Sequence, residues 1–276
     1  MSQFLVRNQT VGGQDVSIMT IPTISLAKLN KNDSHEIKEL QNAASGIGFF
    51  YIDLFEDDIG EKILADMPEM YTASRNYFHQ SNELKLKDVR EDIKPSQDLG
   101  YKCSSCDETY EISWDAISTT RASGLPQVLQ EYGDVIHRFS TLCHQVSLTM
   151  LTALSPPLLN NHRSTQPSNT GLKLISEPSL ARLADVGDHT HTDGGTLTML
   201  FYESLGLQSY HPIDDVWAFI PPWDGRVVIN VADSLQRLSG ETYHSPKHRI
   251  TQVGDGAEER YYLSFFLRPE DALMDG

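Results

Sequence analysis

The chain has 276 residues, of which 39% are hydrophobic and 22% charged, a composition typical of a soluble globular protein with one large or two small domains. Its formal net charge is −16, so phosphate backbones repel it and nucleic acid is not expected as a partner. No run approaches about 18 apolar residues, the N-terminus lacks the apolar core of a signal peptide, and three cysteines are too few for a disulfide framework. We therefore expect a cytoplasmic protein that spans no membrane.

The chain begins with residues 1 to about 20, which have mixed character and are expected to form a loose arm. Residues 21–26 alternate apolar and polar side chains and contain a proline, which predicts an edge strand. Asp33 and Glu36 form a capping-box pattern, so a helix is expected to follow them and to end near Gly46.

A strand is expected at residues 49–52, followed by an amphipathic helix over residues 59–78 that Pro68 would kink. The densely charged residues 81–96 predict a solvated loop. Residues 95 to about 124 have no clear period, and we interpret them as a mobile segment near the mouth of a pocket. This segment contains Cys103-x-x-Cys106. Because the chain has no second cysteine pair, we interpret these as ordinary loop cysteines rather than a metal or redox pair.

Apolar residues then recur in steps of three and four from Leu125 to Leu154, which predicts a bracing helix that Pro156 stops. Beyond it the chain becomes a series of short apolar or alternating runs separated by turns, which is typical of a sandwich or barrel. The expected strands cover residues 172–175, 196–202, 207–210, 216–220, 226–231, 249–253 and 261–267. The chain is thus expected to form one structural unit in three parts: an N-terminal region (1–124), a bracing helix (125–160) and a β core (161–276).

His191 and Asp193 lie two residues apart, so on an extended segment their side chains project to the same side. His248 follows 57 residues later (248 − 191 = 57), far enough for strands to run out and return. Two imidazoles and one carboxylate bind one face of a divalent metal and leave the other face open, which suits non-haem Fe(II). His189 is a rival for His191, but Asp193 follows His191 at the right spacing, so we expect His189 to lie behind the ligands or in the pocket lining. Taken alone, the pattern His191-x-Asp193 is more often a polar turn that binds nothing.

The residues around this triad carry a closer likeness. Ile229–Gly240, Ser245–Ile250 and Arg260, together with residues 21–26, 46–50 and 191–198, closely resemble the isopenicillin N synthase-like Fe(II)/2-oxoglutarate-dependent dioxygenases. The resemblance covers nearly the whole chain. It implies a mixed α/β fold with a mainly β core, namely a distorted double-stranded β-helix (jelly roll) flanked by helices from the N-terminal half. It also implies Fe(II), 2-oxoglutarate and O2 as cofactor and cosubstrates, with His191, Asp193 and His248 as iron ligands.

The resemblance assigns Arg260 to the distal carboxylate of 2-oxoglutarate, which a planar guanidinium can bind through two hydrogen bonds. A surface ion pair with Glu258 or Glu259 is the alternative. Two positions depart from the family. Tyr262 stands where the family usually has a serine that also contacts the carboxylate, and Glu177 stands where many members have a tyrosine. A phenol can still donate a hydrogen bond, but Glu177 would repel an anionic cosubstrate unless it points away or faces a cationic substrate.

The implied activity is oxidation of a small organic molecule, such as a specialised metabolite, through a ferryl intermediate. The outcome could be hydroxylation, desaturation, ring closure or ring expansion, because one fold supports them all. Two alternatives are a cosubstrate-free iron oxidase, in which Arg260 would bind a substrate carboxylate, and a non-catalytic binding protein on the same fold. Phe201, Trp223 and Phe266 are weak candidates for pocket lining, and core positions are the simpler interpretation. The sequence does not indicate an oligomeric state.

Overall fold

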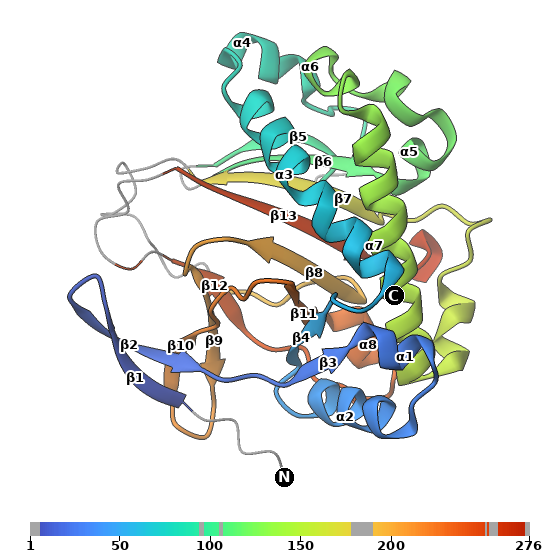
Figure 1. Ribbon diagram of the computed structural model, residues 1–276. Coiled ribbons are helices and arrows are strands. Elements are labelled where there is room, and N and C mark those ends of the chain that lie inside the picture. Colours follow the sequence, from blue (N-terminus) through green and yellow to red (C-terminus); the bar gives the residue numbers. More distant parts are fainter. Residues whose placement is uncertain are drawn as a thin grey trace.

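The computed structural model describes residues 6–93, 97–104, 107–177, 190–251, 253 and 259–273. Within these residues the chain forms two β-sheets that pack face to face, and helices cover the outer face of the larger sheet (Figure 1). This arrangement agrees with the expected jelly roll flanked by helices.

The larger sheet has eight strands, and neighbouring strands are antiparallel except for the first pair, β3 and β4. In spatial order its strands are β3 (Thr23–Ser25), β4 (Phe49–Asp53), β11 (Arg226–Val231), β8 (Leu197–Tyr202), β13 (Arg260–Leu267), β7 (Gly171–Glu177), β6 (Glu108–Ser113) and β5 (Gly100–Cys103).

The smaller sheet has five strands, and only the pair β2–β10 is parallel. In spatial order they are β1 (Val6–Val11), β2 (Gln14–Met19), β10 (Val216–Phe219), β9 (Leu207–His211) and β12 (His248–Ile250). Since β12 pairs with β9, the chain that carries His248 is anchored to the sheet opposite β8.

The α-helices of the described chain come mainly from its first half. They are α1 (Leu26–Asn30), α2 (Ser34–Ser45), α3 (Asp58–Phe78), α4 (Asn82–Lys85), α5 (Trp114–Thr120), α6 (Gln127–Gln130), α7 (Gly133–Leu154) and α8 (Asp233–Leu238). Short 3-10 turns are η1 (Leu86–Asp88), η2 (Arg121–Gly124), η3 (Pro156–Asn161) and η4 (Asp271–Leu273). Among the described helices, none is both long and apolar enough to cross a membrane.

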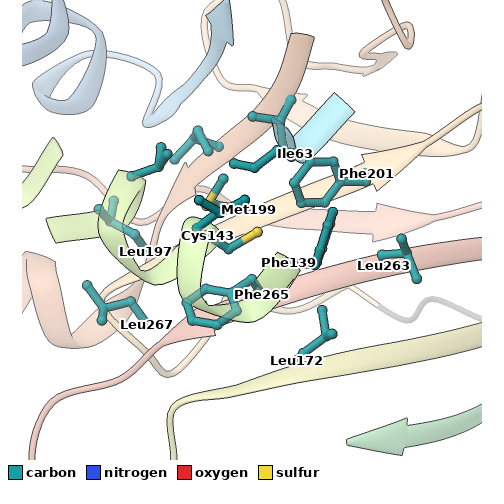
Figure 2. Close-up of a cluster of buried hydrophobic side chains, with 14 of the residues drawn as sticks. Ile63, Phe139, Cys143, Leu172, Leu197, Met199, Phe201, Leu263, Phe265 and Leu267 are labelled. Carbon is teal, nitrogen blue, oxygen red and sulfur yellow. The ribbon is translucent and has the colours of Figure 1, made fainter. Parts of the chain in front are cut away.

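Side chains of β8 alternate between two hydrophobic cores, as the period of a strand requires. Leu197, Met199 and Phe201 pack in the core beneath the helices, whereas Leu200 and Tyr202 pack between the two sheets. Figure 2 shows that Phe139 and Cys143 of α7 pack in the core beneath the helices, against side chains of β8 and β13. The helices therefore fix the outer face of the larger sheet and leave its inner face for a cavity.

Most of the expected elements are confirmed. The strands predicted in the second half of the chain appear as β7 to β13, β3 lies at a sheet edge, and Asp33 caps α2 by accepting from the backbone N–H groups of His35 and Glu36. Helix α3 runs through Pro68 without ending.

Four expectations about the first half were wrong. Residues 6–19 are a β-hairpin rather than a loose arm. The charged stretch after residue 81 contains α4, and Lys85 is buried there with an ion pair to Glu108. The segment of residues 95–124, in which no regular element was expected, forms β5, β6 and α5, although its expected place near the pocket is confirmed because Asp98, Ser104, Asp107 and Thr109 line the cavity described below. The bracing helix begins at Gly133, because α6 and α7 are separate helices.

Candidate metal centre

His191, Asp193 and His248 meet at one point on the inner face of the larger sheet. The Nε2 atoms of His191 and His248 lie 3.6 and 3.7 Å from Oδ1 of Asp193. One potential ligand atom from each residue lies within 4.8 Å of the other two, and among the described residues no other group of three His, Cys, Asp or Glu side chains does so. The structure therefore brings all three expected ligands together.

Two neighbouring strands hold the Asp193 carboxylate in this orientation. Its Oδ2 accepts hydrogen bonds from the Thr198 hydroxyl at 2.6 Å and from the Asn230 side-chain amide at 2.9 Å. Burial alone would raise the pKa of Asp193, but His248, Thr198 and Asn230 outweigh it, so the pKa lies below its usual value. The carboxylate is thus held ionised with Oδ1 directed at the two imidazoles.

The two histidines are fixed through their backbones as well as their rings. The backbone N–H of His191 donates to the carbonyl of His248 at 3.0 Å, and the reverse bond has the same length. Nδ1 of His248 lies 3.2 Å from the carbonyl oxygen of Pro246, and this partner leaves Nε2 as the acceptor that faces Asp193. Burial lowers the pKa of His248, which favours the neutral imidazole that a metal requires.

This donor set fits a divalent transition metal. Three adjacent octahedral ligands at about 2.1 Å from a metal lie about 3 Å apart, so separations of 3.6 and 3.7 Å would close with small side-chain rotations. Nitrogen and carboxylate oxygen on one face suit Fe(II) and leave positions for other ligands. His191 is half exposed, so the open side of the set faces the cavity.

The triad lines a cavity of about 630 Å³ on the inner face of the larger sheet. One wall of the cavity carries two cations, Lys173 and Arg268, whose charges are balanced by the carboxylates of Asp98 and Glu111. Lys173 lies 2.8 Å from Asp98 and 3.2 Å from Glu111, while Arg268 pairs with the same Glu111. Burial works against the charge of Lys173, but the carboxylates of Glu111 and Asp98 raise its pKa above the usual value.

Phe266 stands in the middle of this wall, half-buried, with the Lys173 ammonium 5.0 Å and the Arg268 guanidinium 4.6 Å from its ring centre. Of the three aromatic residues considered from the sequence, only Phe266 lines the cavity. Phe201 lies in the core beneath the helices, and Trp223 is about half exposed and stacks on Tyr51.

Of the two residues expected to hold the cosubstrate, one lines the cavity of the triad and the other does not. Tyr262 lines the cavity, is almost fully buried, and donates to Oε2 of Glu177 at 3.2 Å. Arg260 begins β13, and its Nη1 donates to the carbonyl of Leu205 at 2.9 Å. Arg260 is not among the described residues that line the cavity of the triad. The structure thus brings Tyr262, but not Arg260, into one cavity with the candidate ligands.

Several contributors to the site have no motif of their own. Asn230 interrupts an apolar strand, and a polar side chain in such a run is the signal that could have identified it. Lys173 is likewise a charged residue within the mainly apolar strand β7, and Arg268 directly follows the mainly apolar strand β13. His189 and Cys106 lie outside the described residues. Cys103 ends β5 instead of lying in a loop, is exposed, and forms no disulfide with a described residue.

Comparison with known proteins places these residues in context. Residues 156–269 match the sequence model of the 2OG-Fe(II) oxygenase superfamily, a range that includes the triad and Arg260. The chain is 31% identical over 272 residues to a 2-oxoglutarate-dependent dioxygenase, gloE of Glarea lozoyensis, covering 91% of this chain and 80% of that protein.

Solved structures agree with the fold. A full-length Neurospora crassa protein, crystallised in complex with alpha-KG and 5-formyluracil, superimposes with a TM-score of 0.74 at 21% identity, and the match covers 98% of this chain and 88% of that protein. The 2-oxoglutarate complex of the dioxygenase for auxin oxidation from Arabidopsis thaliana gives a TM-score of 0.73 at 19% identity, with 91% and 94% covered.

Proposed function

The chain belongs to the 2OG-Fe(II) oxygenase superfamily and is an Fe(II)- and 2-oxoglutarate-dependent oxygenase, and from this premise we propose that His191, Asp193 and His248 are its iron ligands. One observation carries the assignment: both imidazole Nε2 atoms face the same carboxylate oxygen, at 3.6 and 3.7 Å, inside a cavity large enough for small ligands.

The protein's part in the reaction is to hold and orient. Thr198 and Asn230 aim the Asp193 carboxylate, and the Pro246 carbonyl aims the His248 ring. Iron in this position supplies the reaction with dioxygen that couples decarboxylation of 2-oxoglutarate, giving succinate and carbon dioxide, to oxidation of the substrate. Phe266 and the charged side chains of Lys173, Asp98 and Arg268 form part of the wall that a substrate would contact.

Of the two residues expected from the sequence, Arg260 is proposed to receive the distal carboxylate of 2-oxoglutarate. A guanidinium stays charged at every working pH and binds a carboxylate in a fork. Tyr262, two residues along the same strand, lies at the cavity surface, but its hydroxyl already donates to Glu177.

The substrate is proposed to be a small specialised metabolite that makes polar contacts. The cavity volume of about 630 Å³ suits a ligand of that size, and many of the described residues that line it are polar or charged. The Neurospora crassa protein that shares the fold was crystallised with a small base, 5-formyluracil. The acidic net charge argues against a nucleic acid substrate, and the oxidation could be a hydroxylation, a desaturation or a ring formation.

Anaerobic titration tests the cosubstrate assignment. Fe(II) with 2-oxoglutarate should give a weak visible charge-transfer band, and Arg260→Ala should weaken it. Succinate released in air separates this function from a cosubstrate-free iron oxidase, which would form none. If neither the band nor succinate appears, 2-oxoglutarate must be removed from the proposal.

His248→Ala tests the ligand assignment. We expect loss of bound Fe(II) and of iron-dependent turnover with an unchanged circular dichroism spectrum, because one of three ligands is gone. His211→Ala is the matched control, since His211 is a buried histidine of the neighbouring strand β9 and belongs to no ligand set among the described residues. Full iron content in His248→Ala would show that the ligand has been misassigned.

A further inference from the structure

Tyr262 separates two cavities. It lines the cavity of about 630 Å³ that holds the candidate ligands, and it also lines a second cavity of about 300 Å³ together with Arg260 and Arg75. Among the described residues, Tyr262 alone lines both cavities, so its side chain forms part of the wall between the cavity of Arg260 and that of the triad.

Neighbouring groups fix the ring in this place. The hydroxyl donates to Glu177, which is 7% exposed and sits opposite Arg260 in the pairing of β7 with β13. A methyl group added at Gly206 would lie 2.6 Å from the Tyr262 hydroxyl oxygen and 3.3 Å from Nη1 of Arg260. Glycine at this point lets the phenol and the guanidinium lie side by side, and a larger residue would have to displace the phenol hydroxyl.

The Tyr262 phenol obstructs a cosubstrate with two carboxylates, such as 2-oxoglutarate, but not a shorter 2-oxo acid with one carboxylate. With the phenol in place, the distal carboxylate of 2-oxoglutarate faces an aromatic ring and the Glu177 carboxyl instead of Arg260, and a nearby like charge is unfavourable. A 2-oxo acid without a distal carboxylate, such as pyruvate, would need only the metal end of the cavity.

Resting on the function proposed above, we infer that Tyr262 is a specificity-determining residue for the 2-oxo acid. It stands across the path to Arg260, so 2-oxoglutarate forms its ion pair with Arg260 only when the phenol has left its hydrogen bond to Glu177. The binding of short 2-oxo acids is unaffected. If the open arrangement is a minor state of about 10% or less, the apparent Kd for 2-oxoglutarate is raised about tenfold or more.

Calorimetric titration of the full-length protein loaded with Mn(II) tests this inference without turnover. The Kd values for 2-oxoglutarate and pyruvate are measured for the wild type, Tyr262→Ser and Tyr262→Phe. We expect Tyr262→Ser to lower the Kd for 2-oxoglutarate about tenfold or more and to change that for pyruvate less than twofold. Tyr262→Phe keeps the ring but loses the hydrogen bond to Glu177, so it should lower the Kd for 2-oxoglutarate severalfold. This variant remains informative if Tyr262→Ser does not fold.

Tyr202→Phe is the matched control, because Tyr202 is a buried tyrosine paired with Tyr262 whose hydroxyl donates to the Ile220 carbonyl instead. Its ratio of the two Kd values should equal that of the wild type. Weaker binding of 2-oxoglutarate to Tyr262→Phe would overturn the inference by making the hydroxyl a direct ligand, and unchanged ratios in both Tyr262 variants would overturn it too. If the wild type binds neither Mn(II) nor a 2-oxo acid, it is the proposed function that fails.

Discussion

At the residue scale, the two oxygens of Asp193 have different partners. Oδ2 accepts from Thr198 and Asn230, while Oδ1 faces the two imidazoles. A carboxylate held on one side in this way has little freedom to rotate, so its position is set before a metal arrives. Residues behind the ligands are therefore expected to influence metal affinity although they never touch the metal.

Thr198→Val should weaken Mn(II) binding about 10- to 100-fold, because the isosteric side chain removes one of the two donors that aim Asp193. Isothermal titration with Mn(II) measures the change. Thr109→Val is the control, since Thr109 lines the same cavity without a contact to the triad. Equal affinities for the two variants would contradict an orienting role of Thr198.

The triad was accessible from the sequence because a short motif and one distant histidine carry its chemistry. The separation of Arg260 from the cavity was not, because it depends on where the Tyr262 ring lies, and that follows from Glu177 on another strand and from the space at Gly206. Arg260 as carboxylate ligand stays a prediction.

At the scale of elements, the sequence predicted strands that alternate over a buried core and failed where that signal is missing. Strand β1 is exposed along its middle four residues, so it shows no apolar face. The break between α6 and α7 falls at residues 131 and 132, just before Gly133 packs against Ala122 so closely that an added methyl group would lie 2.2 Å from the Cβ of Ala122. The apolar period runs straight through this point, so the sequence predicted one continuous helix.

Helix α7 also carries a histidine that should make stability depend on pH. His144 stacks on Trp114 with ring centres 4.6 Å apart, and its Nδ1 is buried without a hydrogen-bond partner among the described residues. Burial, with His162 nearby, lowers its pKa to about 4. Between about pH 6.5 and 4 the unfolded chain binds a proton that the folded chain does not, so stability falls as pH falls through this window.

Between pH 7 and pH 4 the unfolding free energy should fall in both proteins, but we expect the fall to be about 2–3 kcal/mol smaller in His144→Phe than in the wild type. Urea denaturation at several pH values measures this difference. His137→Phe, on the same helix, is the control and should follow the wild type. Parallel pH profiles for wild type and His144→Phe would show that His144 does not titrate as described.

At the scale of the whole molecule, the candidate ligands tie distant parts of the chain together. His191 and Asp193 precede β8 of the larger sheet, whereas His248 begins β12 of the smaller sheet. A metal bound by all three would link the two sheets and bind only the folded chain, so it should stabilise the fold by mass action.

Mn(II) at about 100 times its Kd should add about 2.7 kcal/mol of stability, which raises the Tm by about 5–8 °C for a protein of this size. Differential scanning calorimetry measures the shift. Asp193→Ala should abolish it, whereas Asp92→Ala, at an exposed acid paired with Arg90, should retain it. A shift of equal size in both variants would mean that the ion binds elsewhere.

The reciprocal backbone bonds between His191 and His248 have a consequence for the supply of iron. The spacing of the two rings is set by this backbone pairing and does not depend on a metal. The metal site is therefore preorganised before the ion binds. A chelator should remove the ion without unfolding the protein, although the ion-free form is the less stable of the two, and added Fe(II) should restore activity without a refolding step. In a cell short of iron, we expect the protein to remain folded without its ion and to become active when Fe(II) binds.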